Sequence, residues 1–314
     1  MTESRTRMLQ GARHTNKRFG PSSYTRLAEA LPFLLPALII FGTFTLYPLV
    51  DTIRLSFMEW NGFSGSPVTF VGFDNYDYVF TKDPVFWTAA KNSIIWVMLS
   101  LLIPTTGGLL LALLLNQPVP GRNIFRTIYY LPAVLAPIAV ATMWRWMYNP
   151  YFGVVNYLLK TLGLESLKQP WLSDPDIAIF SVFAASAWVV TGLNMVLFLA
   201  GLQNVPPELK EAARVDGAGQ LNVFRHVTIP SLRPTLIIVI AFTIINSLKV
   251  FDLIVGMTNG APAQSTQVLA LWSYTQSFGN HAFGIGNAIG TVLLGLTLII
   301  VIPYLVWSLR ETGE

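Results

Sequence analysis

The chain has 314 residues, of which 53% are hydrophobic and only 11% are charged, and its mean hydropathy is +0.54. Because soluble proteins carry about 25% charged residues, this composition excludes an ordinary water-soluble enzyme and indicates an integral membrane protein. The chain has no cysteine, which excludes disulfides, thiolate metal sites and cysteine nucleophiles, and its formal net charge is +4.

Residues 1–30 form a polar, arginine-rich segment that we interpret as an N-terminal tail. The apolar run that follows is about 20 residues long and has no small-residue cleavage site, which is typical of a membrane-spanning helix rather than of a signal peptide. We therefore expect residues 31–91 to hold the first transmembrane helix and its external loop.

Six stretches of 15 residues or more contain no Asp, Glu, Lys or Arg. Since about 20 apolar residues cross the hydrocarbon core as a helix, these stretches predict an all-α, polytopic protein with six transmembrane helices. In the last stretch only residues 283–307 are apolar enough to span. The stretches are 30–50, 92–121, 127–144, 177–207, 234–248 and 253–309.

The fifth stretch is too short to span the membrane alone, since a helix of that length rises only about 22 Å. We therefore predict a helix from Pro234 to about Val255, which carries Lys249 and Asp252 near its outer mouth. The two charges are spaced to pair at i, i+3. An interfacial ion pair and a role in a pathway or gate remain as alternatives.

The distribution of basic residues predicts the orientation in the membrane. With the N-terminus inside, the inner segments carry 13 Lys and Arg residues and the outer segments carry 7. Because basic residues favour the cytoplasmic side, both termini are expected in the cytoplasm of a multi-pass protein. The same residues then face anionic lipid headgroups, which explains the positive charge without nucleic acid.

The inner loop at residues 205–230 connects the fourth and fifth predicted spans. Two prolines open a helix there, because their missing N–H groups cost nothing in a first turn, and Gly217 and Gly219 end it. A second short helix is predicted to run from there to Pro230.

One face of the first helix in this loop carries small side chains, and alanines there let another surface approach closely. Four residues share that face by their i, i+3, i+4 and i+7 spacing: Leu209, Ala212, Ala213 and Asp216. We predict that a partner protein docks on the loop. The alternative is a helix resting on the membrane surface, but its apolar face is too small for strong lipid binding.

The loop contains the run Glu211-Ala212-Ala213, then Gly217 after three residues, then Val227-Thr228-Ile229-Pro230 after nine more. This pattern resembles the EAA loop of binding-protein-dependent ABC importers, which has Glu-Ala-Ala, three residues, Gly, nine residues and Ile-x-Leu-Pro. Every spacing matches, and the departures are Val227 and Ile229 in place of the usual Ile and Leu.

The resemblance extends over nearly the whole chain and omits only the tail at residues 1–30. The segments Phe70–Tyr76, Trp144–Pro150 and Phe251-Asp252 are similar to those of carbohydrate-uptake permeases of the maltose type. One departure is Gly260-Ala261-Pro262, where the family usually has Gly-Gly-Pro.

This resemblance implies the type I ABC importer permease fold, with a core at residues 92–309 that holds helices two to six, and a C-terminal tail at 310–314. It implies one transmembrane subunit of an ATP-driven sugar importer in the plasma (inner) membrane of a bacterium or archaeon. Its implied partners are a second homologous permease, two cytoplasmic ABC ATPase subunits and an extracytoplasmic solute-binding protein. ATP and Mg are used by the ATPases, and this chain binds no cofactor.

In this family the EAA helix sits in a cleft of the ATPase and transmits its closure to the spans. The resemblance therefore assigns the coupling to Glu208, Glu211, Ala212, Ala213, Asp216, Gly217, Gly219 and Pro230.

The chain has no G-x-x-x-x-G-K-[ST] run, so it is not expected to hydrolyse ATP itself, and energy must come from a partner or a gradient. The histidines His14, His226 and His281 lie in separate segments and predict neither a metal site nor a catalytic triad. Another cargo such as glycerol phosphate, a self-contained channel or secondary carrier, and a regulatory membrane anchor remain as alternatives.

Polar and aromatic side chains inside the apolar stretches are candidates for a substrate pathway. Amides in lipid need partners, so each either bonds to a neighbouring helix or contacts a ligand with hydroxyl groups. Aromatic rings suit a ligand with apolar faces, although this does not single out a sugar. The predicted pathway residues are Tyr130, Trp188, Asn194, Asn246, Asp252 and Asn287.

Overall fold

The computed structural model describes residues 23–310, which divide into one unit up to Asp51 and another from Thr52. In the first unit, α1 (Ser23–Phe41) and a π-helical turn (Gly42–Leu46) lead into α2 (Tyr47–Leu55). Of the N-terminal tail predicted at 1–30, residues 1–22 lie outside the described residues, and residues 23–30 already belong to α1. Residues 311–314 also lie outside.

Long apolar helices dominate the described part of the chain and confirm the expected all-α membrane architecture. Among the described residues, five helices are long and apolar enough to cross a membrane. A bent pair of helices, counted as one span, raises the number to six. In the second unit the long helices are α4 (Phe86–Ser100), α5 (Thr106–Leu115), α9 (Ala178–Gln203), α12 (Ile229–Leu248) and α15 (Phe283–Arg310).

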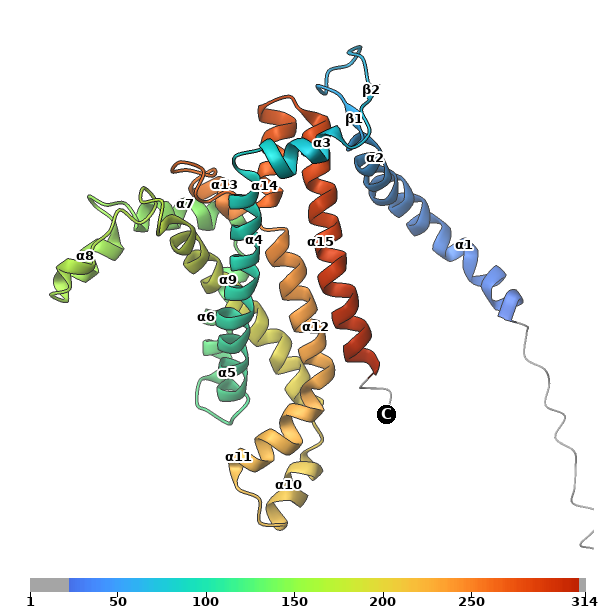
Figure 1. The fold of residues 1–314 in the computed structure, drawn as a ribbon. Helices are drawn as coiled ribbons and strands as arrows, with labels where there is room; N and C mark the ends of the chain where they lie inside the picture. The colour runs from blue at the N-terminus through green and yellow to red at the C-terminus, as the bar shows by residue number, and fades with distance from the viewer. Residues whose placement is uncertain (1–22, 311–314) are drawn as a thin grey trace, which may run out of the picture. The chain divides into compact units, whose positions relative to one another are not determined.

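Shorter elements of the second unit lie at the two ends of these helices (Figure 1). At one end are α10 (Pro207–Val215) and α11 (Gln220–Val223). At the other are the antiparallel strands β1 (Met58–Glu59) and β2 (Thr69–Phe70), in which Met58 pairs with Phe70. That end also holds α3 (Asp74–Asp77), α7 (Pro137–Met147), α8 (Val154–Thr161), α13 (Asp252–Met257) and α14 (Leu269–Tyr274).

Helix α9 is the centre of the packing. It contacts α5, α12 and α6 (Arg122–Val134), while α12 also contacts α4 and α15. Glycines allow two of these close approaches: a Cβ built on Gly192 would lie 1.9 Å from the carbonyl oxygen of Tyr129, and one on Gly108 would lie 2.7 Å from the Cβ of Asn194. Small residues at helix contacts are the usual means of tight packing in membranes.

The third predicted span is not a straight helix. Helices α6 and α7 meet at 99°, with Ala136 in an extended conformation (ψ 134°) directly before Pro137. Proline disfavours a helical conformation at the residue before it, which explains where the helix breaks. The single helix predicted over residues 127–144 is therefore wrong, and it is replaced by two helices of 13 and 11 residues.

The fifth predicted span gains its length at the opposite end from the one we expected. The chain is helical without a break from Gln220 to Leu248, 29 residues, through α11, a π-helical turn (Phe224–Thr228) and α12. The prediction of a separate short helix that stops at Pro230 is wrong, because the helix continues through Pro230, which directly follows the π-helical turn. Local π adjustments of this kind let a membrane helix accommodate a proline.

The predicted extension of this helix to Val255 is also wrong. The helix ends at Leu248, and a new helix, α13, begins at Asp252, whose carboxylate lies in a first turn where negative charge is favourable. Among residues 23–310 no ion pair joins Lys249 to Asp252. Both side chains are exposed, so the helix break removes the need to bury either charge.

Candidate functional site

The EAA-like loop folds as a rigid turn between two helices. Pro207 is the first residue of α10, and Asp216 caps its C-terminus. Gly217 follows with a φ of +82°, in the left-handed region that favours glycine. The N–H of Gly217 donates to the carbonyl of Arg214 (3.0 Å) and the N–H of Ala218 to that of Ala213 (2.9 Å), the two bonds of a Schellman motif.

Most predicted coupling residues are exposed on this loop. Glu208, Glu211 and Asp216 form no ion pair within the described part of the chain. Ala213 is half-buried, and the others are exposed, namely Ala212, Gly217, Gly219 and Pro230. The structure thus brings the acidic and small residues together on one exposed surface. We call α10, α11 and the turn between them the knob.

The knob also exposes apolar side chains, of which the sequence pattern had indicated only Leu209. Val215 is 87% exposed, Leu221 is 76% exposed and Leu209 is 50% exposed. An apolar patch of this kind next to carboxylates is typical of a protein interaction surface. These residues lie on both α10 and α11, so helical periodicity within α10 alone could not group them.

The loop is connected to the membrane helices by packing and by a continuous helix. Helix α10 packs against α11 and the following π-helical turn, and these continue directly into α12. On its other side a polar hollow of about 390 Å³ separates α10 from the ends of α5 and α9; Lys210, Arg214 and Gln117 are among its lining residues. Displacement of α10 would therefore carry α12 with it more directly than α5 or α9.

A small cavity of about 150 Å³ lies between α4, α9 and α12. It has no charged lining residue, and its polar groups are hydroxyls and one amide. Its polar and aromatic lining consists of Trp96, Ser100, Ser186, Phe242, Thr243, Asn246 and Ser247. Only Asn246 among them was predicted; the serines carried no sequence signal, because a serine in a helix can bond to its own backbone.

Asn194 lies next to this cavity and joins two helices. Its side chain is fully buried, and its Nδ2 donates to Thr105 Oγ1 (3.4 Å), which lies 3.5 Å from Thr243 Oγ1. Its Oδ1 has no protein partner. Asn194 thus makes the interhelical contact that was one of the two alternatives.

The structure does not gather the other predicted pathway residues at this cavity. Tyr130 and Trp188 are exposed, and the Trp188 ring lies edge-on to Trp144 with centroids 5.9 Å apart. Asn287 donates to the carbonyl of Phe283 in its own helix (2.8 Å). Asp252 lines a separate hollow of about 270 Å³ with Pro137 and Phe251.

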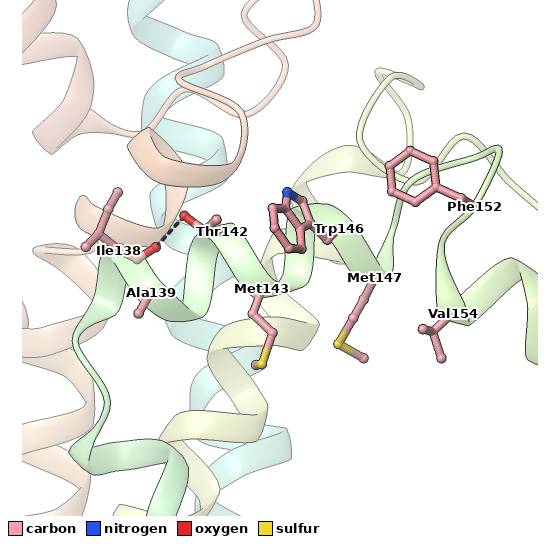
Figure 2. Close-up of a pocket in the computed structure, with 8 residues that line it drawn as sticks. All are labelled: Ile138, Ala139, Thr142, Met143, Trp146, Met147, Phe152 and Val154. Atoms are coloured by element: carbon pink, nitrogen blue, oxygen red, sulfur yellow. Dashed lines mark hydrogen bonds between the residues drawn. The ribbon is translucent and has the colours of Figure 1, made fainter.

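A wide apolar groove runs along α7. Figure 2 shows Met143 and Met147 pointing down from the helix and Trp146 at its upper edge, with Phe152 beyond them. The groove encloses about 700 Å³, and its single hydroxyl, on Thr142, donates to the Ile138 carbonyl (2.9 Å). With no charged side chain in its lining and mostly apolar residues, this surface suits lipid or an apolar protein face rather than a sugar. Among residues 23–310 no cluster of His, Asp or Glu could hold a metal ion.

Known proteins with the same architecture identify the family. Residues 104–310 match the family described as the binding-protein-dependent transport system inner membrane component. A probable ABC transporter permease of Pyrococcus horikoshii is 40% identical over 88% of this chain and 94% of its own. The trehalose/maltose transport system permease protein MalF of Thermococcus litoralis is 33% identical over 87% and 90%.

A solved structure agrees with these relatives. It is a bacterial alginate ABC transporter in complex with an alginate pentasaccharide-bound periplasmic protein, one chain of which is 26% identical to this chain. The TM-score is 0.79, and the match covers 92% of this chain and 96% of that one. The expected ABC importer permease fold is confirmed, and the chain belongs to the family of inner-membrane components of binding-protein-dependent transport systems.

Proposed function

We propose that this chain is one transmembrane subunit of an ATP-driven sugar importer. A second, homologous permease completes the translocation pathway, two cytoplasmic ABC ATPases bind the EAA loops, and an extracytoplasmic solute-binding protein delivers the cargo. The relative MalF and the alginate transporter are both named for carbohydrate transport, which supports a sugar as cargo. The apolar groove on α7 offers a surface of the kind that a second permease could cover.

The observation that carries the proposal is the continuous helix from the EAA loop to the cavity. A continuous helix begins at Gln220 in the exposed knob and reaches Leu248. It lines the cavity through Thr243 and Asn246. When ATP binding closes the ATPase dimer, α10 moves with it, and α12 transmits the movement to the spans. They then rock from an inward-open to an outward-open state.

The chemistry of the cavity favours an uncharged sugar over a phosphate ester. Hydroxyls, an amide and an indole can bond to sugar hydroxyls and cover an apolar sugar face. A phosphate would enter without any cation in the lining, and burying an unpaired charge costs several kcal/mol. The cavity therefore does not favour glycerol phosphate.

A self-contained secondary carrier is also disfavoured. Such carriers place acidic or histidine side chains within their spans as proton relays. The sequence has no Asp, Glu or His between residues 92 and 121, between 177 and 207 or between 283 and 309, and Asp252 is exposed outside the long helices. Without a nucleotide-binding loop of its own, the chain requires partner ATPases. Because these ATPases are cytoplasmic and bind the EAA loop, we place the α10 end in the cytoplasm, and both termini on the same side.

Copurification tests the assembly. The tagged chain is purified from its native membrane in a mild detergent, and the copurifying proteins are identified by mass spectrometry. We expect a P-loop ATPase and a second polytopic permease in comparable amounts. Recovery of the chain alone, in a detergent that preserves known ABC complexes, would contradict the importer and favour a channel or carrier.

Replacing the cavity amide tests the pathway. Asn246→Leu should raise the sugar concentration needed for half-maximal uptake about fivefold, since the lost hydrogen bond is worth about 1 kcal/mol. The matched control is Asn287→Leu, because both side chains donate to the carbonyl four residues earlier in their own helix. Equal uptake by Asn246→Leu and the parent chain, or equal loss in both variants, would contradict a role for this cavity.

A further inference from the structure

A second hollow lies at the end of the unit opposite α10, between the β1–β2 hairpin, α3 and the start of α15 (Figure 1). It encloses about 380 Å³. Its polar and aromatic lining consists of Glu59, Trp60, Asn61, Asp74, Asn75, Tyr78 and His281. If the α10 end faces the cytoplasm, this hollow opens on the extracytoplasmic side, where the solute-binding protein arrives.

The walls of the hollow are fixed by contacts that are distant in sequence. The N–H of Phe283 donates to the carbonyl of Trp60 (2.9 Å), and their rings lie 5.0 Å apart. The buried Asn75 donates through Nδ2 to the carbonyls of Ser56 and Met58, each at 2.9 Å. The hairpin is therefore held on the first turn of α15, and the hollow is preformed.

The loop before α15 is also held in an uncommon conformation. His281 has a φ of +54°, a region that non-glycine residues rarely adopt, and its ring lies 4.9 Å from that of Phe63. Strained residues of this kind are concentrated at binding and switch sites. The strain therefore agrees with a functional role for the rim.

Two carboxylates in the hollow form no direct ion pair in the described part of the chain. They are those of Glu59 and Asp74, and both residues are exposed. The neighbouring acid Asp77, outside the hollow, is paired with Lys82 at 2.9 Å. The hydrogen bond to Asp77 raises the pKa of Lys82, and the charge of Asp74 raises it further. Lys82 thus forms its ion pair with Asp77, outside the hollow.

Carboxylates beside aromatic rings form a site for an organic cation. A guanidinium group can bond to both oxygens of a carboxylate and stack on an indole or a phenol ring. The volume accepts one long side chain, and the open mouth suits a group presented by a protein surface. We propose that this hollow receives an arginine side chain of the solute-binding protein when it docks; this rests on the proposed importer function.

Association kinetics test the docking site. The copurified transporter is placed in nanodiscs, and binding of its own solute-binding protein is followed by surface plasmon resonance at low and at physiological salt. Charges on the rim of an interface act mainly on the association rate and its salt dependence. Removing both carboxylates in E59Q/D74N should slow association about tenfold at low salt and flatten its dependence on salt.

The control is E165Q/D176N, which removes two exposed carboxylates from another predicted outer segment, one of them, that of Glu165, 3.7 Å from Lys168 Nζ. It should associate like the parent. Equal ATPase content and an equal melting temperature show that each variant assembles. An unchanged rate in E59Q/D74N, or equal slowing in both variants, would overturn the proposed site. Failure of the parent complex to bind any solute-binding protein would instead contradict the importer function.

Discussion

Gly217→Asp is expected to abolish uptake while the chain remains inserted in the membrane. Gly217 has a φ of +82°, and a Cβ there would meet nothing within 4 Å inside this chain. The cost to folding is therefore about 1–2 kcal/mol of backbone strain. The larger effect comes from the partner surface, because the new carboxylate would occupy the turn that the ATPase must contact. Transport assays and immunoblots of the membrane fraction measure both.

Gly163→Asp is the matched control for this prediction. Gly163 also has a positive φ, +74°, and open space around it, but it lies in a predicted outer segment far from the EAA loop in sequence. Its backbone strain should match that of Gly217→Asp, and uptake should stay near the parent level. Wild-type uptake in Gly217→Asp would contradict the coupling role of the loop, whereas equal loss in both variants would show that strain alone is responsible.

The sequence was sufficient to locate most membrane helices because a lack of charge is a local property. It could not predict the bend at Pro137, since proline has different effects in this chain. Pro104 lies in a π-helical turn of a span that continues, and Pro234 lies inside α12. Whether a proline breaks a span depends on which neighbours bond to the freed backbone groups, and that is a tertiary property.

The error at the fifth span has a related cause. We extended the short apolar stretch toward Val255, whereas the helix extends toward Gln220 and includes Arg225 and Arg233. A basic residue near the end of a helix can direct its charge toward the membrane surface, so it need not end the helix. A charge-free interval therefore marks the core of a span and does not fix either of its ends.

The first helix of the EAA loop and its glycine turn were predicted because their pattern is local, whereas the cavity depends on three helices. Asn246 and Asn287 show the difference: each donates to the carbonyl four residues earlier, but only Asn246 lies among residues of α4 and α9. Trp96 and Ser186 reach that cavity from distant parts of the sequence. Nothing in their own segments distinguishes them from ordinary packing residues.

Gly192→Leu is expected to prevent stable folding of the permease. A Cβ at this position would lie 1.9 Å from the Tyr129 carbonyl oxygen and 2.8 Å from its carbonyl carbon. Both atoms belong to the backbone of α6, so no side-chain rotation relieves the clash, and α6 must separate from α9. Overpacking of a core costs about 1–3 kcal/mol where side chains can adjust, and a backbone clash should exceed that range.

Gly295→Leu distinguishes this steric effect from the general effect of leucine in a membrane helix. Gly295 also lies inside a long helix, α15, but its Cβ position meets nothing within 4 Å. We expect Gly295→Leu to purify at the parent level with an unchanged melting temperature, and Gly192→Leu to be degraded or to melt at least about 10 °C lower, given the several °C per kcal/mol typical of folded proteins. Parent-like stability of Gly192→Leu would show that α6 is free to move away from α9. The tight contact between the bent third span and the central helix would then not be needed for folding.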